Sequence, residues 1–151
     1  MSETQSAGRR IADKVTSWEG VTSGIGSRGE QSFKVGGREI GHLHGNTVAH
    51  FFFNKPLWQE LRRAGRISYH PVFPDREGPA ARRILTDEDA DDVIRLMRLN
   101  YDITIDRLNR EAVRSATSEG ERLAGVADQQ HLTGLVERTA FRAGMSPVRL
   151  L

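Results

Sequence analysis

Residues 33–46 read FKVGGREIGHLHGN, and this stretch decides which kind of fold the chain can adopt. Apolar and polar residues alternate on both sides of Gly36-Gly37. A glycine pair between two alternating segments is typical of a two-residue β-hairpin. This turn pairs Val35 with Arg38 and Phe33 with Ile40. The sequence therefore predicts antiparallel β-structure within residues 31–54.

The predicted pairing also fixes which side chains share a face of the sheet, because successive side chains of a strand point to opposite faces. It places Arg38 on the same face as a set of apolar residues and two histidines. That set is Phe33, Val35, Ile40, His42 and His44. A one-residue change of register would move every one of these side chains to the other face.

The next turn is marked by Gly45-Asn46, after which residues 48–53 return as a largely apolar strand. The length of this turn decides where His50 points. A three-residue loop pairs His42 with His50 on one face, whereas a two-residue loop turns His50 to the other face. Both alternatives stay open at this stage. The run Phe51–Phe53 is interpreted as a strand buried on both faces, with an apolar pocket wall as the alternative.

Outside this segment, apolar spacing predicts three helices and two further short strands. The helices cover residues 9–18, 56–64 and 87–112, and the strands cover 67–73 and 81–85. Pro56 suits the first turn of its helix, Gly65 ends that helix, and Thr86 caps the start of the long one. The glycine- and serine-rich residues 21–29 are interpreted as a flexible loop.

This order of elements predicts an α+β fold, a two-layer sandwich with an antiparallel sheet and helices packed on one face. We expect a flexible N-terminus at residues 1–8 and the α+β domain at residues 9–112. A C-terminal helical extension is expected at residues 113–151.

Composition excludes several classes of protein. The 151 residues contain no cysteine, so disulfides, thiolate metal sites and cysteine nucleophiles are ruled out. No apolar run approaches about 18 residues and residues 1–30 lack an apolar signal core, so we expect a cytoplasmic protein without a membrane partner. The formal net charge of +2 comes from scattered basic residues opposed by the acidic run 87–92, so nucleic-acid binding is not favoured.

Four segments together resemble the small luciferase-domain family, which is named for the fungal luciferase. They are WEGV at residues 18–21, FKVGGREIGHLHG at 33–45, YHPV at 69–72 and the end of the acidic helix, LNY at 99–101. The element order and the glycine pair are also similar to the MmcQ/YjbR group, which implies a frataxin-like α+β sandwich. The resemblance covers roughly residues 11–103.

The resemblance implies chemistry without an obvious cofactor. The fungal enzyme adds O₂ to an electron-rich hydroxypyrone without flavin, and such a substrate can react with O₂ once it is deprotonated to an enolate. A protein then has to supply a base, a cation that holds the enolate, and a dry pocket.

The histidines are the residues on which the functional interpretation depends. His42 and His44 lie two apart on a strand and therefore project from one face, where two imidazoles can meet a substrate or a metal ion. Three interpretations stay open: hydrogen-bonded strand residues, a substrate-facing acid/base group, or metal ligands. Glu39 as a further ligand would have to reach across the sheet. We predict no cofactor, with a divalent metal at His42 and His44 as the alternative.

Candidate site residues follow from this interpretation. The predicted catalytic residues are His42, His44 and His70. The predicted substrate-binding residues are Arg38, His50, Phe52, Tyr69 and Tyr101. We expect the two catalytic histidines of the hairpin to face a cavity walled by phenylalanines and by the long helix.

Three functional classes remain. The first is a small-molecule enzyme of secondary metabolism, a cofactor-independent oxygenase or a related enzyme that handles an enolisable substrate. The second is a non-catalytic module that binds nucleic acid or protein. The third is assembly through residues 121–144, whose apolar stripe packs either as a lid over the open edge of its own sheet or, as we favour, against a second copy in a homodimer. The stripe consists of Leu132, Leu135, Val136, Ala140 and Phe141.

Overall fold

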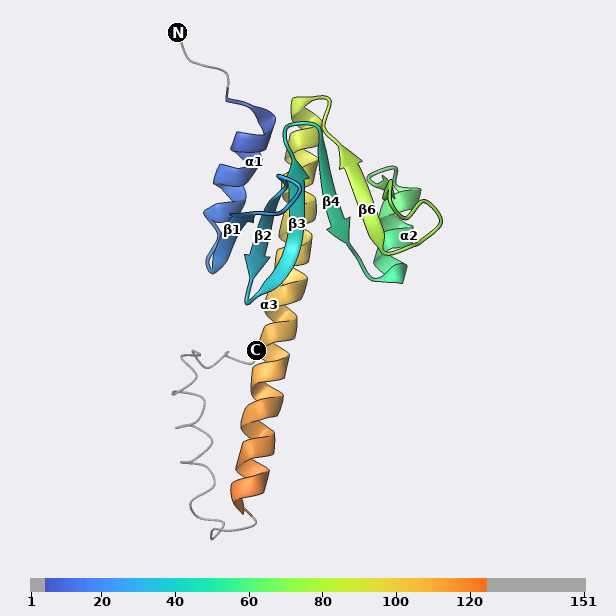
Figure 1. Ribbon diagram of the computed structural model, residues 1–151. Coiled ribbons are helices and arrows are strands. Elements are labelled where there is room, and N and C mark those ends of the chain that lie inside the picture. Colours follow the sequence, from blue (N-terminus) through green and yellow to red (C-terminus); the bar gives the residue numbers. More distant parts are fainter. Residues whose placement is uncertain (1–4, 125–151) are drawn as a thin grey trace. The chain divides into compact units, whose positions relative to one another are not determined.

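The computed structural model describes residues 5–124 and has the predicted α+β architecture (Figure 1). Within these residues lie three helices, α1 (Ala7–Thr16), α2 (Lys55–Arg63) and α3 (Asp87–Ala124). The six strands are β1 (Val21–Ile25), β2 (Gln31–Val35), β3 (Arg38–His44), β4 (Val48–Phe52), β5 (Ser68–Tyr69) and β6 (Pro79–Arg83). They form one antiparallel sheet in the order β1-β2-β3-β4-β6-β5.

The helices cover one face of this sheet, and a single apolar core lies between the two layers. In Figure 1, α3 runs behind the strands, with α1 beside β1 and α2 beside β6. Each helix contributes buried side chains to the core, and so do the strands. The helical contributors include Ile11, Val15, Trp58, Leu61, Val93, Leu96 and Met97, and the strand contributors include Phe33, Ile40, Leu43 and Phe51. Fully burying one such side chain stabilises the fold by about 1.5–3 kcal/mol.

One irregularity in the hairpin changes the predicted faces. Val35 pairs with Arg38 as expected, but Phe33 pairs with Gly41 and not with Ile40. Ile40 is therefore an extra residue in β3, and β2 and β3 form a β-bulge at this point. Because an extra residue reverses the alternation beyond it, Ile40 and Leu43 are both buried in the core.

The expected grouping of the histidines with Phe33, Val35 and Ile40 was therefore wrong. His42 and His44 lie on the opposite face, which the helices leave open. Arg38 stays opposite Val35, whose side chain lies in the core, so it no longer shares a face with His42. Strict period-two alternation across the whole hairpin was the assumption that failed.

Two residues of the core layer accommodate the bulge. Gly41 has a φ of 156°, and a Cβ on it would lie 2.6 Å from Sδ of Met97 in α3. The buried side chain of Asn100, also in α3, donates to the backbone oxygens of Ile40 (3.1 Å) and Phe52 (3.2 Å). Asn100 thus satisfies two carbonyls at the point where β3 and β4 stop pairing.

The start of α3 is fixed by the cap that the sequence predicts. The Thr86 hydroxyl accepts from the backbone of Asp89, and the Asp89 carboxylate accepts in turn from the backbone of Leu85 and Thr86. The hydrogen bond from Leu85 is the main cause that lowers the pKa of Asp89. Asp92 is buried and paired with Arg66 at 2.7 Å, so this part of the acidic run is not solvated.

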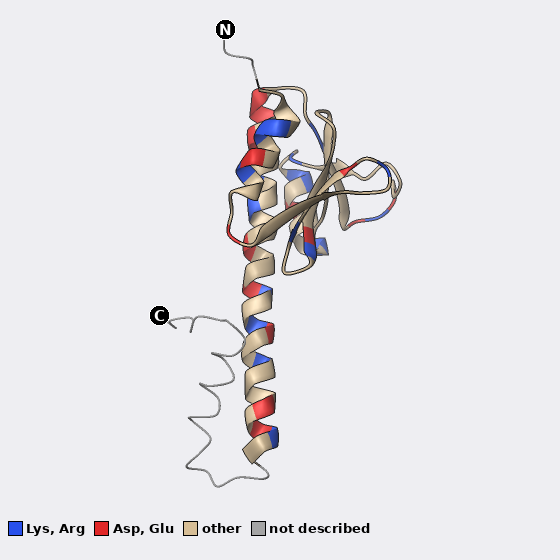
Figure 2. Cartoon of the chain, turned by 60° about the vertical axis from the view of Figure 1, so that its left-hand side comes forward, with Lys and Arg blue, Asp and Glu red and all other residues tan. Residues whose placement is uncertain are grey.

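Other predicted boundaries need correction. Residues 21–25 form β1, an edge strand whose mostly exposed side chains give no alternating pattern. β5 spans two residues only, because the chain turns at His70. α3 continues past residue 112 to Ala124, and its surface carries i,i+4 and i,i+3 pairs such as Arg110–Asp106 and Arg122–Glu119. Acidic and basic residues are intermixed along this helix (Figure 2).

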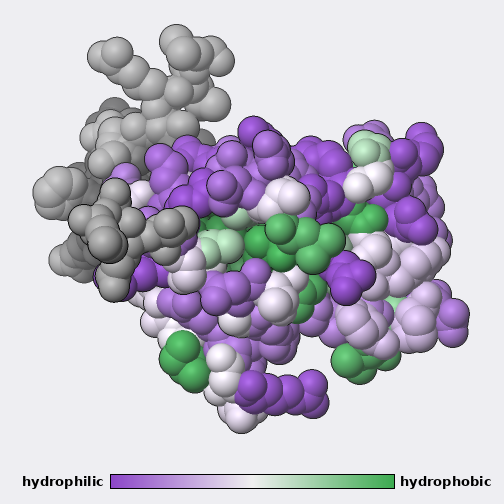
Figure 3. All heavy atoms as spheres, turned by 90° about the horizontal axis from the view of Figure 1, so that it is seen from above, coloured by the Kyte–Doolittle hydropathy of each residue, from purple (hydrophilic) through white to green (hydrophobic). Residues whose placement is uncertain are grey.

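By its internal contacts the chain divides into two units, Met1–Ile105 and Asp106–Leu151. Among the described residues no helix is long and apolar enough to cross a membrane. On the face seen in Figure 3, hydrophilic residues predominate and apolar residues form separate patches. The apolar stripe of residues 132–141 lies outside the described residues, so the homodimer stays a prediction.

The bulge generates the first test. Gly41→Ala should lower the free energy of unfolding by about 1–3 kcal/mol, because the added Cβ overpacks the core against Met97. The melting temperature should fall by about 2–4 °C for each kcal/mol. Gly24→Ala is the matched control, since a Cβ there meets nothing within 4 Å. Equal melting temperatures for the two variants would contradict the described packing.

Candidate histidine site

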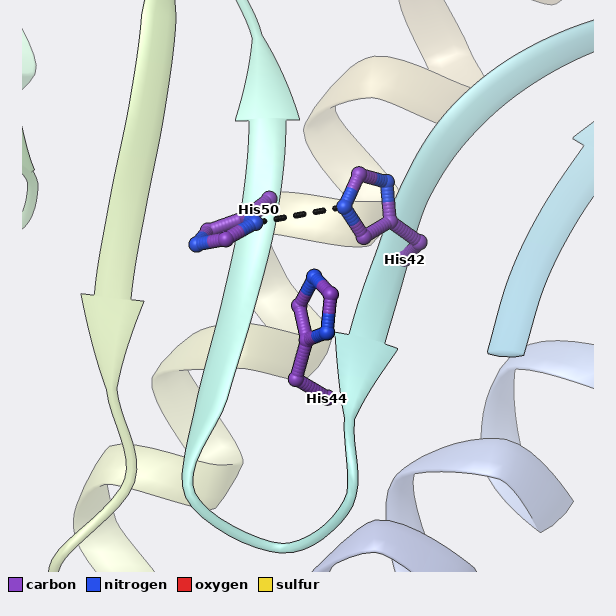
Figure 4. Close-up of side chains that lie close together, drawn as sticks. All are labelled: His42, His44 and His50. Atoms are coloured by element: carbon purple, nitrogen blue, oxygen red, sulfur yellow. Dashed lines mark hydrogen bonds between the residues drawn. The ribbon is translucent and has the colours of Figure 1, made fainter. Parts of the chain in front are cut away.

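Three histidines meet on the open face of the sheet, at the centre of the β3–β4 hairpin (Figure 4). His42 pairs with His50 across the two strands, which confirms the three-residue loop among the two alternatives. The ring centroids of His42 and His44 are 5.1 Å apart, and those of His44 and His50 are 4.7 Å apart. His50 is buried, whereas His42 and His44 are half-buried.

His70 joins this group from a distant part of the sequence. It follows β5 at the turn towards β6, and its Nε2 lies 3.1 Å from Nδ1 of His50. The neighbouring Tyr69 pairs with Ala80 of the core layer and contacts Trp58 of α2. As expected for adjacent residues of a strand, only one of the two faces the histidines.

Glu39 also belongs to the site, although the predicted hairpin pairing placed it on the other face of the sheet. Its Oε1 accepts a hydrogen bond from Nδ1 of His42 at 2.6 Å. The same bulge explains this contact, because it brings residues 39 and 42 to one face. The sequence does show an acidic residue three positions before a histidine. In a regular strand these two residues lie on opposite faces, so the spacing indicates a contact only once the bulge is known.

The hydrogen bonds assign protons to two of the rings. A carboxylate can only accept, so Nδ1 of His42 carries a proton and its Nε2 has a free electron pair when the ring is neutral. The backbone N–H of Val72 donates to Nδ1 of His70 at 3.1 Å, so the proton of a neutral His70 is on Nε2.

These assignments leave His50 with two incompatible neighbours. Its Nδ1 lies 3.2 Å from Nε2 of His42, which offers an electron pair, and 3.1 Å from Nε2 of His70, which offers a proton. A single nitrogen with either a proton or an electron pair satisfies one of them only. When Nδ1 of His50 accepts from His70, its electron pair also faces that of His42, and a positive charge between His42 and His50, whether a proton or a metal ion, would remove this repulsion.

His50 itself does not carry this positive charge at neutral pH. Burial, followed by the nearby rings of His70, His42 and His44, lowers the pKa of His50 to about 3. Burial is also the main cause that lowers the pKa of His70. Nε2 of His50 is buried and has no hydrogen-bond partner among the described residues. At neutral pH the centre of the group is therefore an uncharged ring.

The remaining predicted site residues divide between the two faces. Phe52 lies two positions after His50 on β4, and 65% of it is exposed. The prediction that the run Phe51–Phe53 is buried on both faces of the sheet was therefore wrong. Phe73 is also exposed, and its ring contacts His70. Tyr101 is buried on the helical side, where its hydroxyl donates to the backbone oxygen of Glu19 at 2.8 Å.

The histidine group is not walled by the long helix, because α3 covers the other face of the sheet. A surface hollow of about 500 Å³ is lined by Tyr69, Trp58 and Arg62 on the α2 side, together with Gln59, Arg63 and Glu77. It contains none of the histidines. The group instead lies on the open sheet, beside the exposed rings of Phe52 and Phe73.

Residues 37–100 match the family model of the luciferase domain. This stretch contains Glu39 and all four histidines of the site, and it confirms the resemblance drawn from the sequence. Comparison with curated proteins and with solved structures gives no match. The likeness to the MmcQ/YjbR group therefore stays a prediction.

The low pKa of His50 predicts how stability depends on pH. An unfolded histidine has a pKa near 6.5, so between about pH 6.5 and 3 the unfolded chain binds a proton that His50 in the folded chain does not. The free energy of unfolding should therefore fall as the pH falls through this range. The slope from this residue is at most about 1.4 kcal/mol per pH unit.

Denaturant unfolding of the wild type and of His50→Gln between pH 7 and 4, in chelator-treated buffer, checks this. The groups that face His50 are His42, His44 and His70, with Glu39 behind His42, and all are present in both proteins. The variant should lose stability less steeply than the wild type. Parallel slopes would show that His50 is protonated as easily in the folded chain as in the unfolded chain.

Proposed function

We propose, on the premise that residues 37–100 form a luciferase domain, that the chain is an enzyme for an enolisable small molecule. The substrate would bind over the histidine group, lose a proton to it and react with O₂ through the resulting enolate. The observation that carries this proposal is the Glu39–His42–His50 arrangement. It combines a carboxylate-oriented imidazole with a neutral neighbouring ring whose electron pair faces that of His42, so that a proton between the two rings is stabilised.

His42 is the proton acceptor in this proposal. Glu39 holds the proton of Nδ1, so Nε2 keeps its electron pair, in the way a carboxylate orients the base of a catalytic triad. A proton taken from the substrate would turn His42 into an imidazolium next to the Glu39 carboxylate. It would also give Nε2 a proton to donate to Nδ1 of His50, 3.2 Å away, in place of the proton that His70 donates. The side chain of His42 is 23% exposed, so a substrate can approach the ring from the open face.

The other side chains of the face would bind the substrate. His44 lies against the rings of His42 and His50 and can donate a ring N–H to the enolate oxygen. Phe52 and Phe73 offer exposed aromatic surface for a flat, apolar ring. His70 donates to His50 and thereby holds the central ring in place.

The reaction with O₂ needs no redox cofactor, because the enolate itself supplies the electrons. The enolate carbon and one oxygen atom form a C–O bond, and O₂ takes up the electron pair as a peroxide. The proton held by His42 returns to the outer peroxide oxygen. The product is a hydroperoxide that contains all atoms of the substrate and of O₂.

Proton abstraction can be measured apart from oxygenation. The probe is a 4-hydroxy-2-pyrone in D₂O under argon. Its ring hydrogen between the carbonyl carbon and the hydroxyl-bearing carbon should exchange for deuterium faster when chelator-treated protein is added. His42→Gln should lower the catalysed rate about a hundredfold, the usual share of a general base. Glu39→Gln should lower it by at least roughly tenfold, because the ring loses its orienting partner.

Glu88→Gln is the matched control, since it removes one exposed carboxylate at the start of α3 and leaves the histidine group intact. It should exchange at the wild-type rate. Admitting O₂ should then produce oxygen uptake that follows the same order of variants. Equal exchange by the wild type, His42→Gln and Glu39→Gln would refute the proposed role of this pair.

A further inference from the structure

We propose that His42, His44 and His50 also form a binding site for one divalent transition-metal ion of the zinc type. Metal binding goes beyond the proposed function, since it would hold even if the chain processed no enolisable substrate. The three rings come from β3 and β4, which pair in regular register from His42–His50 to His44–Val48, so their backbones are held at fixed separations.

Distances within the group suit such an ion. Each of the three histidines offers one ring nitrogen, and these nitrogens all lie within 4.8 Å of one another. Nε2 of His42 and Nδ1 of His50 are 3.2 Å apart. Two nitrogens bound tetrahedrally at 2.0–2.1 Å from zinc are separated by about 3.3 Å. This pair is already spaced as ligands, and a rotation of the half-buried His44 ring can bring in the third.

The proton assignments favour the same nitrogens. Nε2 of His42 has a free electron pair because its Nδ1 proton is held by Glu39. A metal-bound histidine typically donates its other ring N–H to a carboxylate, and Glu39 provides this partner. A cation between His42 and His50 would also remove the conflict of two electron pairs facing each other. The Nε2–H of His70 would then turn away from Nδ1 of His50.

The donor set indicates which ions fit. Among the described residues the metal-ligating group consists of three imidazoles without a carboxylate. Such a donor set suits zinc, cobalt, nickel or copper, whereas magnesium and calcium prefer oxygen ligands. With only three protein ligands, a tetrahedral ion keeps one position for water or a substrate oxygen. His70 is not a ligand in this proposal, because Val72 donates to its Nδ1 and its Nε2 carries the proton.

A bound ion and a proton from the substrate would use the same electron pair of His42, so the two proposals require separate tests. The enolate chemistry is tested by proton exchange in chelator-treated protein. The metal site is tested by binding alone, without any substrate. Either one can therefore fail while the other stands.

The binding test uses the full-length, chelator-treated chain titrated with Co²⁺ and then with Zn²⁺. Calorimetry should show one equivalent bound, and Co²⁺ should give the intense visible absorption of a tetrahedral site, which Zn²⁺ then abolishes by displacement. The spectrum needs no variant, so it stays informative even if a substituted chain folds poorly. Absence of saturable binding, or only the weak absorption of octahedral Co²⁺, would overturn the proposal.

Variants then identify the ligands. His44→Gln should abolish the tetrahedral spectrum, and Glu39→Gln should weaken binding about 10–100-fold, as loss of a ligand's hydrogen-bond partner does. Glu88→Gln is the matched control that keeps all three ligands and their hydrogen-bond partners, and it should bind one equivalent within a few-fold of the wild-type affinity. Unchanged binding by His44→Gln, or its loss in Glu88→Gln, would overturn the proposed ligand set.

Discussion

The extra residue in β3 is the constraint on which the rest of this structure depends. Opposite Phe33, the strand contains both Ile40 and Gly41, so Ile40 and Leu43 can both enter the core although they lie three positions apart. The same residue turns His42 and His44 to the open face and brings Glu39 beside them. α3 stabilises this arrangement, since Met97 packs against Gly41 and Asn100 binds the carbonyl of Ile40. The core and the histidine group are thus two consequences of one bulge.

Electrostatics gives this group its chemical character. Glu39 and Val72 fix the protons of the two outer rings, and both rings point at one nitrogen of a buried, neutral His50. A positive charge would therefore be stabilised at one defined place, between Nε2 of His42 and Nδ1 of His50. A proton drawn from a substrate and a divalent cation are two ways of supplying it, which is why a single geometry supports both proposals. Their common requirement is the electron pair on Nε2 of His42.

Much of the fold could be predicted because it depends on local signals. Gly36-Gly37 predicted the hairpin turn, and Thr86 predicted the start of α3. The two possible lengths of the next turn left two alternatives for the face on which His50 lies, and the structure has one of them. The bulge could not be predicted, because nothing within the strand distinguishes Gly41 from an ordinary strand glycine. What distinguishes it is the approach of Met97, which comes from a helix more than fifty positions away. The position of Glu39 beside the histidines and the loss of Arg38 from their face follow from the bulge.

The tautomer of His42 tests the account most directly, because it follows from the Glu39 contact that the bulge creates and because both chemical proposals require it. Long-range ¹H–¹⁵N NMR of the chelator-treated chain at neutral pH distinguishes the two ring nitrogens of each histidine. The account predicts that the proton of His42 is on Nδ1 and that Nε2 is unprotonated, and that Glu39→Gln removes this preference. A His42 ring with its proton on Nε2 in the wild type, unchanged by Glu39→Gln, would contradict it.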